Sequence, residues 1–270
     1  MSENKIKILF AGHGEMGSAL ADGWAGVVPP QNFFIVKKRP DGLSGLRARG
    51  FQADVKFPAD FKADIVVIAV KPQTVKEILP QIAPYAKNGA LVFSVAAGRT
   101  VKFIEDNLGF PAAVARCMPN LGVAVKQGAS GSFANERVTP AQKKMCDTLM
   151  SACGVNIWLK NEDLINAVIA VSGSSPAYIA YFLECLTKAC AEMGLEEKDA
   201  SALALQALRG TAEFLQKTKE APDKFIKKVA TPGGTTEAAV KVLTSSDFKG
   251  LLTRAAQAAA LRAQEREKEN

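Results

Sequence analysis

The chain has 270 residues, with 34 Lys and Arg against 27 Asp and Glu and a net charge of +7, but it contains one histidine, His13. Chemistry that needs two histidines in one chain, such as a HExxH metalloprotease or a histidine-rich zinc or iron site, is excluded, and we expect no metal site. A hydrophobic fraction of 48% with 23% charged residues is ordinary for a globular protein of one large or two smaller domains.

Hydropathy and cysteine usage bear on the compartment. No apolar run approaches the roughly 18 residues that span a bilayer, and the first residues, Met-Ser-Glu-Asn-Lys, lack the apolar stretch of a secretion signal. The five cysteines form no CxxC pair and lie in apolar segments, which favours reduced structural thiols. We therefore expect a cytoplasmic protein that does not bind membranes.

The charge is distributed unevenly along the chain. Residues 1–161 hold 20 basic and 12 acidic residues, whereas residues 162–270 hold 14 and 15. The basic residues are scattered, are not interleaved with aromatic residues, and belong to no RRM, KH or zinc-finger pattern. We expect no nucleic-acid partner and favour a phosphorylated small molecule as the anion that the first part binds.

Residues 1–161 alternate short apolar runs with amphipathic stretches, which is typical of a mostly parallel sheet with crossover helices. The expected strands are 6–12, 33–38, 65–70, 91–96, 114–118, 131–133 and 155–159. The expected helices are 15–25, 74–86, 101–107 and 140–152. The predicted fold class is therefore α/β, with a Rossmann-type doubly wound sheet in an NADP-binding domain over 1–161.

Beyond residue 161 the β-branched runs give way to Ala, Leu, Glu, Lys and Gln, which predicts an all-helical domain over 162–270. Stretches such as 177–193 carry more apolar residues than one small domain could cover. We expect these faces to be buried against a second copy, as a homodimer or a higher homo-oligomer. A self-contained helical bundle is the alternative.

A glycine-rich loop follows the first expected strand. In a GxGxxG pattern of this kind, the first glycine permits a tight turn, the second lets a pyrophosphate approach the backbone, and the third lets helix and strand pack closely. The loop consists of Gly12, His13, Gly14, Glu15, Met16 and Gly17. We interpret His13 as a cofactor contact or a loop residue, because the nicotinamide lies far from this turn. The Glu15 carboxylate would repel the phosphates unless it points outward.

The end of the second strand bears on the choice between NAD and NADP. An Asp or Glu at this place would accept a hydrogen bond from the ribose 2′-hydroxyl of NAD, but the sequence reads Lys37, Lys38, Arg39. Because basic side chains bind a 2′-phosphate, NADPH is the expected cofactor, with NADH as the alternative. A solvated charge run would give the same pattern, and Asp41 could still reach a ribose.

Six motifs, in this order along the chain, carry a family resemblance that runs from about Ile6 to Arg262. They are GxGxMG at 12–17, AVKPQ at 69–73, AAG at 96–98, RCMPN at 116–120, SGSSPAY at 172–178 and TPGGTT at 231–236. Together they resemble the pyrroline-5-carboxylate reductase family. The resemblance implies a Rossmann domain, a helical dimerisation domain, and hydride transfer from NAD(P)H to the C=N bond of 1-pyrroline-5-carboxylate, which yields L-proline at the last step of proline synthesis.

The resemblance also implies two sets of site residues. The implied cofactor contacts are the loop 12–17, Lys38, Arg39, Ala69, Val70, Lys71, Pro72, Ala96, Ala97 and Asn120. The implied substrate contacts are Glu162, Gly234, Thr235 and Thr236. A physical reason supports part of the first set, because the fourth and fifth strands of a Rossmann sheet end at the crevice that holds the nicotinamide half. For Ala96–Gly98, close packing alone is the alternative.

The segment 232–236 precedes a helical stretch expected over 237–243. Its glycines allow unusual backbone angles, its threonines suit a helix cap, and its free amides could bind the substrate carboxylate. An ordinary capped helix start is the alternative. Thr236 is our candidate catalytic residue because it could hydrogen-bond near the ring nitrogen. A hydroxyl is a poor acid, however, so we expect the imine to be protonated before hydride arrives.

The chain departs from the family pattern at a few positions, and two other functions remain open. Ser175 replaces the second glycine of GSGPAY, Glu15 a common Asn, and Leu121 a common Thr. The segment 172–178 contains a proline that suits a helix start, so a helix break before the long helix is its structural alternative. A β-hydroxyacid dehydrogenase would need a catalytic lysine on the first long helix, but Lys188 stands in no such signature. A silent NADP-binding regulator would have lost the 231–236 loop, which is present here.

Overall fold

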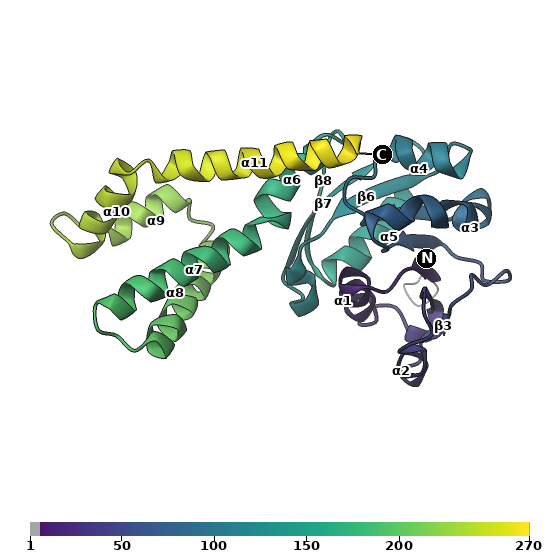
Figure 1. Ribbon diagram of the computed structural model, residues 1–270, viewed down its shortest axis with the longest axis horizontal. Helices are drawn as coiled ribbons and strands as arrows, with labels where there is room; N and C mark the ends of the chain where they lie inside the picture. Colours follow the sequence, from purple (N-terminus) through teal and green to yellow (C-terminus); the bar gives the residue numbers. More distant parts are fainter. Residues whose placement is uncertain (1–5, 270) are drawn as a thin grey trace. The chain divides into compact units, whose positions relative to one another are not determined.

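The computed structural model describes residues 6–269 and divides the chain into two compact units (Figure 1). The first unit contains the chain up to Ser174 together with the residues from Ala259 on, and the second unit is Ser175–Ala258. These units differ from the expected domains, 1–161 and 162–270. The short helix α6 (Leu164–Val168) packs on strands of the first unit, which is why the residues just after 161 cluster with the sheet.

The first unit is built on an eight-stranded sheet of order β3-β2-β1-β4-β5-β6-β7-β8. All neighbouring strands are parallel except β6 and β7, which are antiparallel. The expected α/β doubly wound sheet is confirmed, and each expected strand is present: 114–118 has its predicted bounds, and the others have shifted ends. The strands are β1 (Ile8–Ala11), β2 (Phe33–Val36), β3 (Gln52–Asp54), β4 (Ile65–Ile68), β5 (Leu91–Ser94), β6 (Val114–Met118), β7 (Gly128–Ala134) and β8 (Gly154–Trp158).

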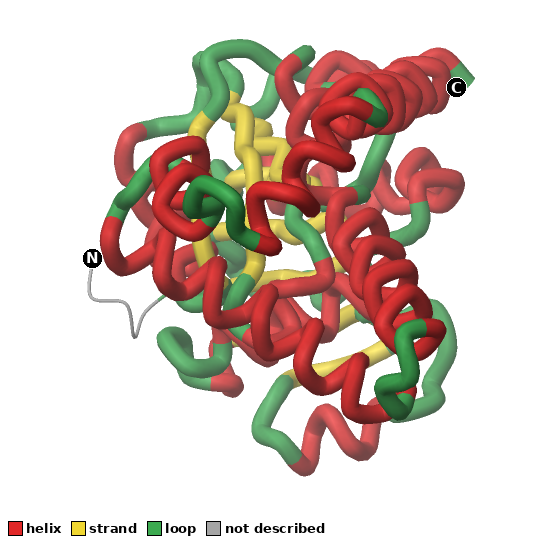
Figure 2. The backbone as a smooth tube through the Cα atoms, turned by 90° about the vertical axis from the view of Figure 1, so that its left-hand side faces the viewer, coloured by secondary structure: helices red, strands yellow, loops and turns green. Residues whose placement is uncertain are grey.

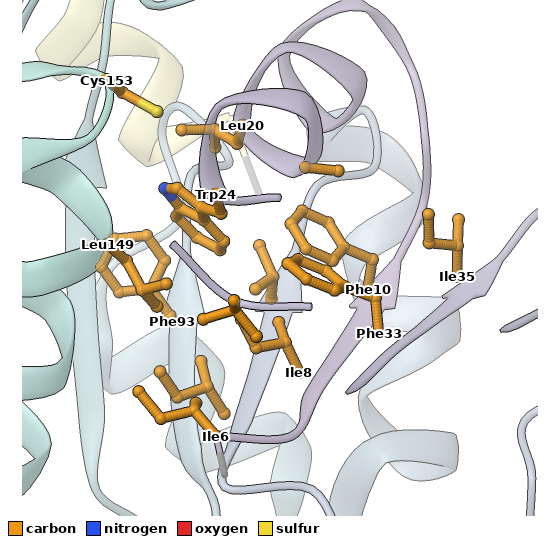
Figure 3. Packing of buried hydrophobic residues seen from close by; sticks show 14 of the residues in the cluster. Ile6, Ile8, Phe10, Leu20, Trp24, Phe33, Ile35, Phe93, Leu149 and Cys153 are labelled. Atoms are coloured by element: carbon orange, nitrogen blue, oxygen red, sulfur yellow. The ribbon is translucent and has the colours of Figure 1, made fainter. Parts of the chain in front are cut away.

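Helices cover both faces of this sheet. Alternate residues of β1 separate the two apolar cores: Ile8 and Phe10 pack with α1, α2 and α5, while Leu9 and Ala11 pack with α3 and α4. The helices are α1 (Glu15–Trp24), α2 (Leu43–Ala48), α3 (Val75–Lys87), α4 (Val101–Leu108) and α5 (Pro140–Ser151). In Figure 3, Trp24 of α1 lies against Phe10, with ring centroids 5.4 Å apart, so the helix that follows the glycine loop is anchored on β1.

The second unit is entirely helical, as expected for this part of the chain. Figure 2 shows helix and loop here, and every described strand belongs to the first unit. Its helices are α7 (Ser175–Glu192), α8 (Glu197–Thr218), α9 (Pro222–Val229), α10 (Thr235–Ser245) and the first part of α11 (Phe248–Lys268). Large apolar side chains are exposed on them, among them Tyr181 at 68%, Leu203 at 64% and Val242 at 64%.

One helical stretch, Leu164–Glu192, is long and apolar enough to cross a membrane by length and composition, with a mean hydropathy of 1.2. The sequence does not show it as an uninterrupted apolar run, because polar residues recur along it. A single stretch of this kind is weak evidence for a membrane span. Only 22% of its most apolar window is buried, so it presents an apolar surface that needs a partner of some kind.

Candidate dinucleotide and substrate sites

The three glycines of the 12–17 loop differ in backbone angle and in the space around them. Gly12 adopts a φ of +100°, and a Cβ there would lie 2.6 Å from the Ala69 carbonyl oxygen, so only glycine fits the turn. Gly14 is the N-cap of α1, and a Cβ at this position would meet no atom within 4 Å. Gly17 is tight, because its Cβ would lie 3.0 Å from the Ala69 Cβ. The loop therefore brings α1 close to β4 and leaves open space beside the helix N-terminus.

His13 and Glu15 face different surroundings within this loop. Burial lowers the pKa of His13, and the positive charges of Lys37 and Arg49 lower it further, against an opposing effect of Asp22. The His13 Nε2 atom is buried and has no hydrogen-bond partner within residues 6–269. Glu15 is exposed, as an outward orientation requires. The surroundings of His13 therefore favour the neutral imidazole.

The three basic residues after β2 have different surroundings: Lys37 contacts Asp41, whereas Lys38 and Arg39 are exposed. The Lys37 Nζ donates a 2.5 Å hydrogen bond to the Asp41 carbonyl oxygen and lies 3.7 Å from the Asp41 carboxylate, which closes the turn between them. Lys38 and Arg39 are exposed and form no ion pair with any other described residue. Two cations at this strand end are therefore without an ion-pair partner among the described residues, whereas Lys37 and Asp41 contact one another.

The loops that follow β4 and β5 are tied together by Arg99, a residue that sequence reasoning missed. Its Nε donates a 2.9 Å hydrogen bond to the Pro72 carbonyl oxygen, and its guanidinium lies 4.7 Å from the centre of the Phe103 ring. Ala69 continues the sheet with a 2.9 Å bond from its amide to the Ala11 carbonyl oxygen. The segments 69–72 and 96–97, both expected as cofactor contacts, therefore end neighbouring strands and share one buried tether.

Asn120 closes a ring of hydrogen bonds with two other residues. Its Oδ1 accepts bonds of 3.1 Å from the amides of Gly122 and Ala129, and its Nδ2 donates a 3.2 Å bond to the Ser172 carbonyl oxygen. The Ser172 hydroxyl in turn donates to the Ala129 carbonyl oxygen. Both acceptor positions of the Asn120 side chain are thus used inside the protein, and its amide nitrogen links the segment after β6 to the chain around Ser172.

A turn of π-helix precedes the long helix α7, and a bend at Ser174 separates the two. Residues Ile169–Gly173 form one turn of π-helix between α6 and α7, with a 2.7 Å bond from the Ser174 amide to the Ile169 carbonyl oxygen. Short π turns within helices are frequent at functional sites. Pro176 lies in the first turn of α7, where its missing amide leaves no helical bond unmade.

Glu162 belongs to a buried charge network. Its Oε1 accepts a 2.5 Å bond from Arg116 Nη1 and a 2.7 Å bond from the Val101 amide at the start of α4. Arg116 also pairs at 3.1 Å with Glu267, whose second oxygen accepts a 3.3 Å bond from Asn166 Nδ2. The Arg116 side chain is only 4% exposed, so the implied substrate contact Glu162 is oriented by a buried cation and a helix N-terminus.

The remaining implied substrate contacts lie in the second unit, at the start of α10. Gly234, rather than a threonine, is the N-cap, and it forms no side-chain cap bond, so the expected threonine cap is wrong. Thr235 and Thr236 are the first two helical residues, and the Glu237 carboxylate accepts a 2.8 Å bond from the Gly233 amide. A Cβ at Gly234 would lie 2.8 Å from the Thr231 hydroxyl oxygen, which explains why glycine is needed at the cap.

Cys117, which lies within the 116–120 motif, is a buried thiol with a raised pKa. Burial raises the pKa of Cys117 to about 12, because the thiolate would be deprived of water. Cys146 and Cys153 are also buried, as expected for structural thiols, whereas Cys185 is exposed. Within the part of the chain that the structure describes, no group of His, Cys, Asp or Glu side chains could hold a metal ion.

Comparison with known proteins gives matches along the whole chain. Residues 5–98 match a family of NADP oxidoreductases described as coenzyme F420-dependent, and residues 162–266 match the pyrroline-5-carboxylate reductase dimerisation family. The pyrroline-5-carboxylate reductase of Pseudomonas aeruginosa is 38% identical over 264 residues, which are 96% of each chain.

Solved structures give the same picture. A pyrroline-5-carboxylate reductase from Coxiella burnetii is 34% identical with a TM-score of 0.93, covering 97% of this chain and 99% of its own. The Plasmodium falciparum enzyme, solved with NADP bound, is 26% identical with a TM-score of 0.85, covering 98% and 99%. Because both halves match in the same order and over nearly the full length, the chain belongs to the pyrroline-5-carboxylate reductase family of NAD(P)H-dependent oxidoreductases.

Proposed function

We propose that this protein reduces the C=N bond of 1-pyrroline-5-carboxylate with NADPH and releases L-proline. The observation that carries the proposal is the 38% identity to a curated pyrroline-5-carboxylate reductase over 96% of the chain. The intact glycine loop and the intact 231–236 loop support it, because a silent NADP-binding relative would need only the first. The match of 162–266 to the reductase dimerisation family likewise disfavours a β-hydroxyacid dehydrogenase.

The cofactor residues that we propose fit a phosphorylated dinucleotide. Gly14 leaves open space at the N-terminus of α1, where backbone amides and the helix dipole favour a pyrophosphate. Lys38 and Arg39 are the exposed cations that would bind the 2′-phosphate, and this is our reason for preferring NADPH to NADH. Bound NADPH supplies the hydride. The protein contributes orientation through the loops after β4 and β5, with Ala69–Pro72 and Ala96–Ala97 as the proposed contacts.

For the substrate, we propose that the start of α10 binds the carboxylate. The amides of Thr235 and Thr236 form no hydrogen bond with another described residue, and they point out of the positive end of an 11-residue helix. Thr236 is half-buried and supplies a hydroxyl that can orient the ring, whereas Thr235 is exposed. Glu162, as the proposed contact in the first unit, would stabilise the positive charge of the protonated imine.

We further propose a cytoplasmic homodimer or higher homo-oligomer. The support is the exposed apolar surface of α7, α8 and α10 together with the match of 162–266 to a dimerisation family. Light scattering on the purified protein tests this proposal. A monomer at micromolar concentration would contradict it, and detergent-dependent solubility would indicate instead that Leu164–Glu192 meets a membrane.

The enzyme assay follows NADPH absorbance after 1-pyrroline-5-carboxylate is added, with NADH in parallel. We expect oxidation of NADPH, and we expect Lys38→Ala with Arg39→Ala to raise the KM for NADPH while leaving that for NADH unchanged. Lys144→Ala, an exposed cation on α5, is the matched control. No oxidation at saturating substrate would refute the function, and equal use of both cofactors by the wild type would refute the role of the two cations.

A further inference from the structure

The end of the C-terminal helix belongs to the sheet-bearing unit, although in sequence it is the part furthest from the glycine loop. Residues from Ala259 on cluster with the first unit, and Glu267 lies in the last turn of α11. Its carboxylate shares the buried Arg116 guanidinium with Glu162, since Nη1 bonds Glu162 at 2.5 Å and Nη2 bonds Glu267 at 3.1 Å. The Arg116 guanidinium therefore pairs with two carboxylates, Glu162 and Glu267, that are far apart in sequence.

This shared pairing fixes the direction in which Glu162 points. The Glu162 Oε1 accepts from Arg116 Nη1 and, at 2.7 Å, from the Val101 amide, so the carboxylate lies between β6 and the first turn of α4. As long as Glu267 occupies Nη2, the guanidinium offers Glu162 only one of its two outer nitrogens. An Arg116 freed from Glu267 could instead take Glu162 in the bidentate geometry that guanidinium and carboxylate prefer, which would draw it off the Val101 amide.

Two further contacts hold the last turn of α11, one made by Glu267 and one by its neighbour Arg266. The second carboxylate oxygen of Glu267 accepts a 3.3 Å bond from Asn166 on α6, which is 3% exposed. The neighbouring residue Arg266 packs against the loop after β5: a Cβ at Gly98 would lie 3.3 Å from the Arg266 carbonyl oxygen. Gly98 also has a φ of +70°, a backbone angle that favours glycine, and a Cβ there would be crowded by Arg266. The last turn of α11 thus packs against the loop that leads into α4.

We propose that Glu267 is a positioning residue for the substrate reaction: by holding half of Arg116 it keeps the Glu162 carboxylate on the Val101 amide, in the orientation that receives the protonated imine. The inference rests on the proposed function, because Glu162 is a substrate contact only if that function is correct. It adds a role for the C-terminal end of the chain, which carries none of the six family motifs.

The test compares Glu267→Gln with Glu265→Gln in the full-length protein. Glutamine at 267 keeps the shape and one acceptor oxygen, so the fold is retained, but it loses the charge that competes for Arg116. Glu265 lies on the same helix and pairs with the exposed Arg262 at 2.8 Å, which makes it a matched control. We expect Glu267→Gln to lower kcat/KM for the imine about tenfold, with less than about a twofold change in the KM for NADPH. Glu265→Gln should leave both unchanged.

A double-mutant cycle separates positioning from a purely structural contribution. If Glu267 acts through Glu162, its substitution causes no further loss in the Glu162→Gln background, so the two effects are not additive. Full additivity, or equal behaviour of the 267 and 265 variants, would overturn the proposal. Hydrogen exchange of the Val101 amide gives a readout without catalysis: we expect faster exchange in Glu267→Gln than in Glu265→Gln. If the wild type is inactive but the Val101 amide still exchanges faster in Glu267→Gln than in Glu265→Gln, the proposed function is refuted, whereas the role of Glu267 in holding Arg116 is supported.

Discussion

Asn120→Ala removes the three side-chain hydrogen bonds of Asn120, while the bond from the Ser172 hydroxyl to the Ala129 carbonyl oxygen remains. The amides of Gly122 and Ala129 lose an acceptor at 3.1 Å, and the Ser172 carbonyl loses a donor at 3.2 Å. Each bond contributes about 0.5–1.5 kcal/mol, so the three together amount to about 3 kcal/mol. Ala129 is exposed and water can replace its partner, which leaves an expected loss of about 2 kcal/mol.

Thermal unfolding followed by circular dichroism measures this loss. For a unit of this size, about 1 kcal/mol corresponds to roughly 2–4 °C, so Tm should fall by about 4–8 °C. Asn107→Ala is the matched control, because the Asn107 side chain donates one bond to the Phe103 carbonyl oxygen within α4. Its Tm should fall by less than half as much. If both variants shift Tm equally, or if Asn120→Ala stays within about 1 °C of the wild type, the ring does not stabilise the π turn.

Three other predictions concern the glycine loop, its histidine and the thiols. A Cβ at Gly14 would meet no atom, so Gly14→Ala should leave Tm unchanged while raising the KM for NADPH. A Cβ at Gly17 would lie 3.0 Å from the Ala69 Cβ, so Gly17→Ala should lower Tm as well as raise this KM. Equal Tm values for the two variants would contradict the packing argument. Burial lowers the pKa of His13, so stability from the neutral imidazole is complete above its ordinary value of 6.5 and is lost as pH falls below it. His13→Asn should flatten the decline of Tm between about pH 7 and pH 5, and an unchanged slope would contradict the assignment. Because burial raises the pKa of Cys117 to about 12, it should react with a disulfide reagent at about pH 8 only after unfolding, and rapid native labelling would contradict its burial.

The sequence predicted the parts of the fold that depend on apolar pattern. The runs over 65–70 and 91–96 became β4 and β5 because strands buried on both faces are almost continuously apolar. Leu43–Ala48 and Gln52–Asp54 were missed as helix and strand, since each is short and mixes polar with apolar residues. Their structure comes from neighbouring elements: β3 exists because it pairs with β2 at the edge of the sheet.

Side-chain networks were beyond the reach of sequence patterns. Arg116 pairs with residues 46 and 151 positions away, and such separations leave no local pattern. Asn120 stands in a recognisable motif, yet its resemblance-based interpretation as a cofactor contact gave no hint that its Oδ1 binds two amides of the protein itself. The threonines of 235–236 suited a cap by residue type, but the close approach of Thr231 allows only glycine at the capping position.

Three polar side chains near the carboxyl ends of the central strands form hydrogen bonds that fix the backbone. Arg99 joins the loops after β4 and β5, Arg116 holds Glu162, and Asn120 joins β6 to the π turn. Burial lowers the pKa of His13 in the glycine loop, and His13 is the one side chain with an ordinary pKa near 6.5. Hydride transfer to a protonated imine needs a rigid arrangement more than a protein acid. It follows that the pH dependence of kcat/KM should track protonation of the imine, and that His13→Asn should leave this profile in place.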